Sequence, residues 1–417
     1  MARWLIIVMI LVWAVPAWSW QIHGFVDGRS GMRLQEDPVE RDAILNELRL
    51  QLDVNHMGDV AIWQFRGDLV ADEAVGESEQ DFDRGYGMFD LREANVLLTP
   101  FSLVDIKLGR QILTWGTGDL LFINDLFPKD WQSFFIGRDV EYLKAPSDAA
   151  MFSFYPNWAN VDVIYVPRFD ADRYISGERI SYWNPLLSRR AGSEDDMRVD
   201  HRSAWFDEDE WHLRISRNYN GLEVAAYGYN GYWKSPQGVD ASYRTYFPEL
   251  SVYGASVRGS LWGGVANAEI GYYDSREDRN GDDPFVPNSE TRVLLGYERE
   301  LARDFSAAAQ YYLEAMTEYS AYRRTLPEEM SSRDEYRHVL TLRLTRQLLN
   351  QNLVLSLFGY WSPSDRDAYL RPDLKYKASD AVSLYLGANI FIGDHPETFF
   401  GQFENSTNLY VGARYSF

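Results

Sequence analysis

Residues 47–55 read Glu-Leu-Arg-Leu-Gln-Leu-Asp-Val-Asn, so polar and apolar side chains alternate at every position. Successive side chains of a β-strand point to opposite faces of the sheet. The stretch therefore predicts a strand with leucine and valine on one face and charged or amide side chains on the other. A strand with two such different faces is typical of a wall that separates an apolar environment from water.

The same alternation recurs to the end of the chain and predicts eighteen strands. Short turns such as 57–59 and 262–264 fall at every second connection, whereas the connections between them are mostly longer and polar. An even strand number, short periplasmic turns and long extracellular loops are typical of a transmembrane antiparallel up-and-down β-barrel. We therefore expect an all-β chain with a single barrel domain over residues 20–417. The expected strands are 22–34, 42–57, 58–72, 86–99, 101–115, 149–156, 160–168, 210–219, 221–233, 250–261, 264–275, 289–300, 303–318, 333–348, 352–363, 368–377, 382–393 and 405–417.

The first nineteen residues have the pattern of a secretory signal peptide. Arg3 precedes an apolar run from Trp4 to Val15, and small residues then offer a cleavage site near Ser19. The alternative is an uncleaved anchor helix, but the apolar run is short for the ~30 Å of hydrocarbon in a bilayer. Together with the barrel pattern, this segment predicts that the chain is exported to the bacterial outer membrane.

Composition narrows the classes of protein. The chain has no cysteine, which excludes a scaffold held by disulfides and thiolate metal sites. It has 14 Trp, 27 Tyr and 22 Phe, and barrels place such side chains in belts at both membrane interfaces. The net charge of −21 argues against nucleic acid as a partner.

The C-terminal residues alternate and the chain ends on an aromatic side chain. Gly412, Tyr415 and Phe417 resemble the signal that the outer-membrane assembly machinery reads. We therefore expect this machinery, the lipid bilayer and lipopolysaccharide to be partners. The acidic outer loops are interpreted as a solvated surface, with divalent-cation bridging to lipopolysaccharide as the alternative.

The connection 116–148 is too rich in apolar side chains to lie freely in water. We expect it to fold into the barrel and narrow the pore, because long ordered loops are more often functional. The alternative is a loop that packs over the barrel mouth and makes it rigid. The expected constriction residues are Trp115, Asp119, Phe122, Asn124, Asp125, Trp131 and Phe135.

One part of the sequence resembles a known family. The alginate-export type of outer-membrane porin and its relatives share three features with this chain, namely Leu108-Gly109-Arg110-Gln111, Trp115-Gly116 and Asn124-Asp125. The resemblance implies a β-barrel that acts as a channel. It does not extend to the solute, because an alginate exporter is expected to line its pore with an excess of Arg and Lys.

The inward face carries as many acidic as basic side chains on our assignment, which predicts a mixed-charge lumen with weak ion preference. The pore-lining side chains expected to meet the solute are Arg49, Asp53, Arg66, Asp68, Lys107, Arg214, Glu223, Arg258, Glu269, Arg292, Arg343, Arg371, Lys375 and Arg414.

Catalytic and metal-binding patterns are weak. The six histidines are scattered and belong to no zinc or nucleophile motif. Residues 278–283 have oxygen ligands at alternating spacing but lack the glycine and distal glutamate of a calcium loop, so a tight acidic turn is preferred. We expect no enzyme activity, no cofactor and no metal.

The sequence thus predicts a passive outer-membrane channel for small polar or amphipathic solutes. The alternatives are a non-conducting surface barrel for interaction or envelope assembly, and a soluble exported all-β binding protein.

Overall fold

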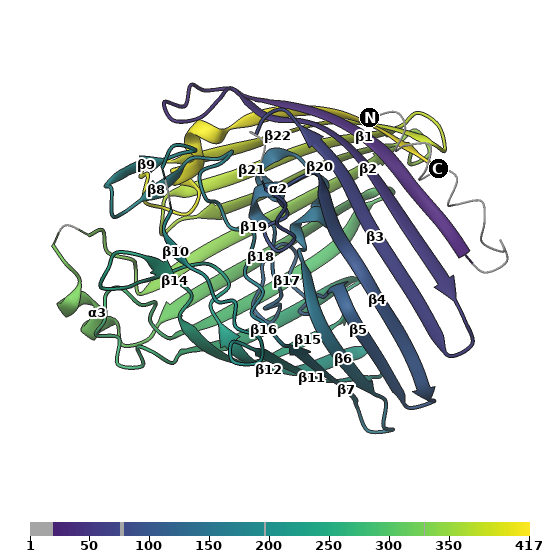
Figure 1. The fold of residues 1–417 in the computed structure, drawn as a ribbon, viewed down its shortest axis with the longest axis horizontal. Coiled ribbons are helices and arrows are strands. Elements are labelled where there is room, and N and C mark those ends of the chain that lie inside the picture. The colour runs from purple at the N-terminus through teal and green to yellow at the C-terminus, as the bar shows by residue number, and fades with distance from the viewer. Residues whose placement is uncertain (1–19, 76–78, 196, 329) are drawn as a thin grey trace.

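Eighteen strands of the described chain form one antiparallel sheet that closes on itself (Figure 1). The computed structural model describes residues 20–417 except 76–78, 196 and 329. The first nine strands of the wall are β1 (Trp20–Arg33), β2 (Ala43–Met57), β3 (Ala61–Asp72), β4 (Phe89–Phe101), β5 (Val104–Ile112), β6 (Pro146–Phe154), β7 (Asn160–Val166), β11 (Glu210–Tyr219) and β12 (Leu222–Tyr232). The other nine are β15 (Glu249–Leu261), β16 (Gly264–Ser275), β17 (Glu290–Ala302), β18 (Phe305–Met316), β19 (Tyr336–Leu348), β20 (Leu353–Ser362), β21 (Asp367–Lys377), β22 (Val382–Gly393) and β23 (Asn408–Ser416). The predicted fold class is confirmed.

The sheet closes because the last strand pairs with the first. β23 lies antiparallel to β1, with Val26 opposite Tyr415. The register continues to the end of the chain, where the Phe417 N–H donates to the Gly24 carbonyl at 3.0 Å. Closure gives the backbone groups of both strands a partner, which is what allows a sheet to lie in hydrocarbon.

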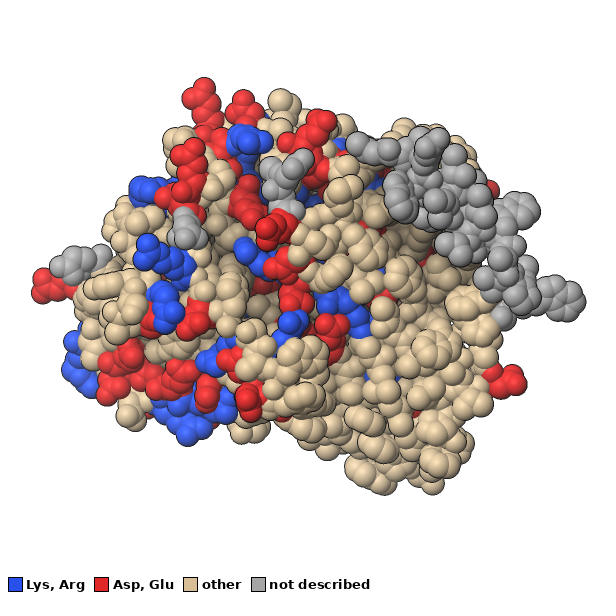
Figure 2. All heavy atoms as spheres, in the orientation of Figure 1, with Lys and Arg blue, Asp and Glu red and all other residues tan. Residues whose placement is uncertain are grey.

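The two faces of the wall differ as the alternation predicts. Trp63, Phe65 and Leu386 point outward and are 52, 41 and 43 % exposed. On β19 the outward Leu342 is exposed while the neighbouring inward Thr341 is buried. Figure 2 shows charged side chains gathered over the end of the barrel with the long loops, and a mostly uncharged surface over the rest of the visible wall.

Long connections at one end of the barrel carry the smaller elements. These are α2 (Trp131–Ile136), η2 (Val140–Leu143), β8 (Tyr182–Asn184), β9 (Arg189–Ala191), β10 (Val199–Asp200), β13 (Gly238–Val239), β14 (Thr245–Tyr246), α3 (Tyr319–Thr325) and η3 (Gly401–Ser406). Among the residues that the structure describes, none of the helices has the length and apolar character needed to span a bilayer.

Strand boundaries differ from the expectation where the chain leaves the wall for the lumen. β5 ends at Ile112 because residues 113–115 turn inward, and the Trp115 ring packs 5.1 Å from the ring of Phe127. The last strand begins at Asn408, since η3 occupies the residues before it. The predicted signal peptide, residues 1–19, lies outside the described residues.

Candidate functional site

The connection between β5 and β6 lies inside the barrel. We call residues 113–145 the inner loop. It contains α2, which is capped at its N-terminus by Asp130, whose carboxylate accepts a hydrogen bond from the Ser133 N–H at 2.7 Å. It ends at Gly137 in the left-handed conformation that glycine adopts freely. The inner loop corresponds to the expected segment 116–148.

The first part of the inner loop is anchored to β16 by one buried carboxylate. Glu269 is 3 % exposed and accepts hydrogen bonds from the Thr117 hydroxyl and the Gly118 N–H, each at 2.9 Å. The Asn124 side-chain amide donates to the same carboxylate at 2.8 Å. Several donors compensate the cost of burying this group, so Glu269 binds the loop rather than a solute.

Two inward glycines leave room for this part of the loop. Gly254 of β15 and Gly271 of β16 lie opposite each other in the sheet. A Cβ atom at Gly254 would lie 1.8 Å from Asn124 Oδ1, and one at Gly271 would lie 2.7 Å from Ile123 Cγ2. The missing side chains therefore form a slot for residues 123 and 124.

The tip of the loop contacts the neighbouring strands through a partly exposed ion pair and a buried amide. Arg343 of β19 holds the Asp119 carboxylate with two hydrogen bonds, at 2.5 and 2.8 Å. Gln310 of β18 accepts from the Asp119 N–H at 2.7 Å. The side chains of Asp119 and Arg343 are 38 and 28 % exposed, so water screens this ion pair more than the buried ones.

The carbonyl end of α2 is held by the opposite wall. Asn408 of β23 donates to the Phe135 carbonyl at 3.0 Å, and Arg371 of β21 donates to the Arg138 carbonyl at 2.8 Å. Arg29 of β1 donates to the Gly137 carbonyl at 2.7 Å. These donors satisfy carbonyl groups that the short helix leaves without partners.

The last part of the loop extends the anchoring to the first strands. Asp139 forms ion pairs with Arg29 of β1 at 2.7 Å and with Arg414 of β23 at 2.5 Å. The Tyr142 hydroxyl donates to Asp68 of β3 at 2.8 Å, and the Arg49 guanidinium lies 4.3 Å from the Tyr142 ring centre. The inner loop thus contacts the wall on all sides of the lumen.

Apolar side chains fill the space between loop and wall. Ile123, Leu126, Phe134, Phe135 and Ile136 belong to one buried cluster with inward side chains of the wall. The wall members of this cluster include Tyr229, Leu250, Val252, Tyr273, Leu294, Tyr312, Val339, Phe358, Tyr360, Tyr369 and Phe391. The lumen at this level is therefore an apolar layer, and such layers restrict water and ions by dewetting.

The inner loop is also joined to the outer connection 166–210. Residues Asp130 and Arg173 form a parallel bridge, in which the Arg173 N–H donates to the Lys129 carbonyl at 2.9 Å. The buried Arg173 side chain pairs with Asp130 at 3.3 Å and with Asp90 of β4 at 2.7 Å. An outer loop therefore holds the middle of the inner loop against the wall.

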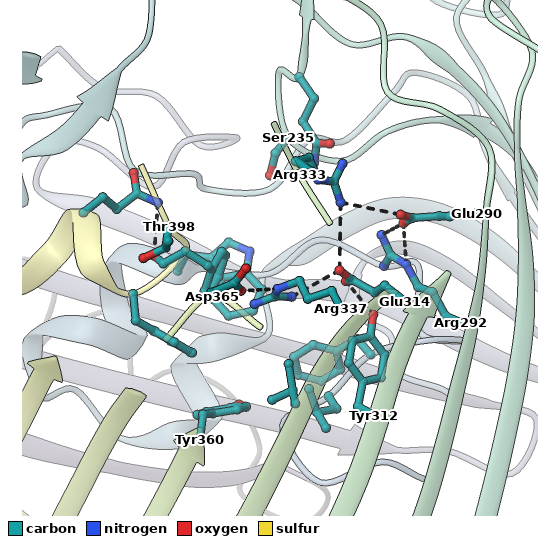
Figure 3. Close-up of a pocket in the computed structure, with 18 of the residues that line it drawn as sticks. Ser235, Glu290, Arg292, Tyr312, Glu314, Arg333, Arg337, Tyr360, Asp365 and Thr398 are labelled. Atoms are coloured by element: carbon teal, nitrogen blue, oxygen red, sulfur yellow. Dashed lines mark hydrogen bonds and ion pairs between the residues drawn. The ribbon is translucent and has the colours of Figure 1, made fainter. Parts of the chain in front are cut away.

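An open cavity lies above the inner loop, on the side of the long connections. We call it the outer vestibule, and its volume is about 1080 Å³. The inner-loop side chains Phe122 and Trp131 line it on one side, and Arg292, Glu314 and Arg337 line it on another. Figure 3 shows these charged side chains pointing toward one another along the ends of the strands.

Solved structures similar to this fold are found among outer-membrane porins. OccAB4 of Acinetobacter baumannii matches with a TM-score of 0.57 and 8 % identity, covering 96 % of this chain and 98 % of that chain. OccD3 (OpdP) of Pseudomonas aeruginosa matches with a TM-score of 0.55 and 11 % identity, over 95 % and 91 % of the two chains. OccK5 (OpdH) of the same organism gives 0.54 and 8 %, over 95 % and 98 %. The fold is that of a porin.

No protein-family model matches the sequence, and no curated protein matches it either. The resemblance to alginate-export porins is not shown by these matches and stays a prediction.

The porin barrel places the expected pore-lining residues in four environments. Those under or against the inner loop hold it in place, and they include Arg49, Asp68, Glu269, Arg343, Arg371 and Arg414. Arg292 instead lines the outer vestibule. The remaining expected pore-lining residues make up the other two environments.

Several of them pair with each other on the wall, among them Arg66 with Asp53 at 2.6 Å and Arg214 with Glu223 at 2.6 Å. Lys107 lies 3.9 Å from Glu93. Arg258 and Lys375 are exposed.

The expected constriction residues all belong to the inner loop, but their environments differ. Asp125 is buried and pairs with Lys129 at 2.9 Å, whereas Trp131 borders the outer vestibule. Phe135 is 1 % exposed and packs in the apolar layer.

Some residues that hold the inner loop belong to the long connection after β7 rather than to a wall strand. These residues were not expected from the sequence. Asp172 accepts from the Lys129 N–H at 2.8 Å and from the Trp131 indole at 3.1 Å, and Arg173 follows it. No periodic signal marks these two residues in the long connection. The inward tyrosines were detectable in principle, because they obey the same alternation as the charges.

Residues 278–283 form a tight turn in which Asp278 accepts from the N–H groups of Asp282 and Asp283 at 3.0 and 3.2 Å. Over the described ranges, the structure brings together no group of three or more His, Asp or Glu side chains with metal-ligand geometry.

Proposed function

We propose that this chain is an outer-membrane channel for the passive passage of small polar or amphipathic solutes, and that the inner loop narrows its pore. The porin fold supports a place in the outer membrane and a solute path along the barrel axis. The lipid bilayer and lipopolysaccharide would then surround the exposed apolar wall.

The inner loop is the observation that carries this proposal. It crosses the whole lumen, yet its tip is held by the partly exposed pair of Asp119 and Arg343. A partly exposed ion pair contributes only about 0–1 kcal/mol. Gln310 and Tyr360 add neutral hydrogen bonds to the main chain of Asp119 and Leu120. The Asp119 pair is nevertheless the most exposed ion pair of the loop, and movement of the tip would open a path beside β18 and β19.

Solute preference follows from the lining of the path. The outer vestibule is bordered by both aromatic and charged side chains, and the two signs of charge are nearly balanced. Such a lining favours small polar or amphipathic molecules over ions of one sign.

Planar-bilayer recording of the mature chain tests the proposal. Deleting Leu120 to Phe135, with a short Gly-Ser linker, removes most of the inner-loop side chains of the apolar layer. Conductance should rise several-fold while the barrel stays folded, because backbone bonds between strands close the wall. A Gly-Ser insertion into the exposed turn at Trp262 and Gly263 is the matched control and should leave conductance unchanged.

A sealed surface barrel is the second candidate function, and the apolar layer between loop and wall favours it. It predicts no conductance in the intact chain and conductance in the deletion variant. Equal conductance of the two forms would show that the inner loop does not lie in the solute path.

A further inference from the structure

A row of charged side chains with alternating sign borders the outer vestibule (Figure 3). It is built from β17, β18, β19, the long connection between β18 and β19, and the short turn between β20 and β21. In order along the row, its members are Arg292, Glu290, Arg333, Glu314, Arg337 and Asp365.

Contacts within the row are not equally strong. Arg337 donates to Glu314 at 3.2 Å and to Asp365 at 2.5 Å, and Arg292 Nε donates to Glu290 at 2.7 Å. Arg333 lies 3.7 Å from Glu290 and 3.9 Å from Glu314, beyond hydrogen-bond distance. Each of these two carboxylates already has a closer arginine. Arg333 is therefore the cation of the row that an incoming group displaces most easily.

Exposure points to the same residue and to one carboxylate. The Arg333 side chain is 51 % exposed and that of Asp365 is 22 %, whereas those of Glu290 and Glu314 are 4 and 12 % exposed. Arg333 is thus the most exposed cation of the row, and Asp365 is its most exposed carboxylate.

The row has three basic and three acidic side chains, and the rest of the vestibule lining has three basic and four acidic ones. A single negative charge attracted by Arg333 also meets the carboxylates beside it, and a single positive charge near Asp365 also meets Arg337. Complementarity of charge pattern decides specificity in such a site more than total charge does. A solute that carries both signs matches the row, whereas an ion of one sign does not.

Aromatic side chains lie beside the row. The Trp131 ring is 6.2 Å from that of Phe122 and 6.4 Å from that of Phe399, and the Arg337 guanidinium lies 5.7 Å from the Phe399 ring centre. Phe399 is 42 % exposed. An apolar or aromatic body of a solute gains contact area on these rings.

We propose that the outer vestibule binds small zwitterions with an aromatic body, of the class of short peptides with an aromatic side chain. The solute carboxylate pairs with Arg333, its ammonium group pairs with Asp365, and its ring lies on Trp131 and Phe399. The inference rests on the proposed function only in that the solute enters from the side of the long connections.

Titration calorimetry on the folded mature chain in detergent tests this with three peptides that share one body. They are phenylalanyl-alanine, its N-acetyl form, which is an anion, and its C-terminal amide, which is a cation. The zwitterion should bind about tenfold more tightly than either modified form, which corresponds to about 1.4 kcal/mol. Equal binding of the three peptides, or tighter binding of the anion, would overturn the proposal.

Two variants test which residue binds each end of the peptide. Arg333→Gln should bring the affinity for the zwitterion down to that for the amide form, and Asp365→Asn should bring it down to that for the N-acetyl form. Arg323→Gln on the exposed face of α3 is the matched control and should change nothing. Heat-modifiable migration on gels checks that each variant is folded. The comparison of the three peptides uses the unmodified chain and therefore tests the proposal even if a variant fails to fold.

The binding and conduction experiments have separate outcomes. A sealed barrel would bind the zwitterion in calorimetry and conduct nothing, whereas a channel of another specificity would conduct and show no preference among the peptides.

Discussion

At the scale of single residues, many inward charges bind protein rather than solute. Alternation places a side chain inside or outside the wall, but it does not tell which inward side chains the inner loop covers. Asn389 illustrates the limit: the alternation places it on the lumen face, yet the residue is fully buried. It hydrogen-bonds to Tyr369 at 2.6 Å and to Asn408 at 2.9 Å. We therefore expect an arginine at this inward position to destabilise the barrel, because the neighbours leave no space.

The glycine slot leads to the first prediction. Gly254→Ala places a methyl carbon 1.8 Å from Asn124 Oδ1, which is far shorter than a van der Waals contact. The loop must therefore move. We expect single-channel conductance to rise several-fold. Gly228→Ala is the control, since its Cβ would meet the Leu213 Cβ at an ordinary 3.8 Å. Unchanged conductance of the Gly254 variant would show that the slot does not position the loop.

Asp170, in the connection after β7, leads to a pH prediction. Burial, together with the neighbouring Glu210 carboxylate, raises the pKa of Asp170 to about 7. The folded state therefore binds a proton that the unfolded chain has already lost above about pH 4. The free energy of unfolding should fall as pH rises from about 4 to 7 and then level off.

Urea unfolding at a series of pH values measures this slope. The slope reports how many more protons the folded state binds than the unfolded state. Asp170→Asn should lower that number by up to one, whereas Asp334→Asn in an exposed connection should leave it unchanged. An identical pH dependence in the Asp170 variant would mean that this carboxyl group does not carry the effect.

At the scale of elements, the strands were predictable because each has lipid on one side and the lumen on the other. All eighteen were expected, with errors of a few residues where the chain leaves the wall. The inner loop was expected from its apolar composition alone. Its partners were not, because Glu269, Arg371 and Asn408 lie far from it in the sequence and become neighbours only after closure.

The outward face of β20 leads to a prediction for the wall. Leu357→Arg places a charge against hydrocarbon near the middle of the strand and should cost about 2–4 kcal/mol of barrel stability. Ser356→Arg, one residue earlier, points into the lumen and is the matched control. Urea refolding into lipid vesicles measures both, and equal losses would mean that the assigned faces are wrong.

At the scale of the whole molecule, the C-terminal residue takes part in closing the barrel and belongs to the predicted assembly signal. Phe417 is bound to Gly24 by backbone hydrogen bonds in both directions, at 3.0 and 3.1 Å, and its ring is 51 % exposed. Removing Phe417 should slow membrane insertion and leave the pore unchanged, because the residue lies outside the lumen. Phe417→Tyr keeps the aromatic end and should insert normally. Pulse-labelled cells report the rate, and a normal rate for the truncated chain would contradict the predicted assembly signal.

The ion pairs of Asp139 also set an order of events in time. Its two arginines belong to the first and the last strand of the wall, which become neighbours only when β23 meets β1. The inner loop therefore completes its anchoring after the barrel has closed. The anchors on β16 and β3 do not need this closure. We therefore expect a barrel that has closed but has not yet formed the Asp139 pairs to conduct more than the finished molecule, until the last part of the loop docks.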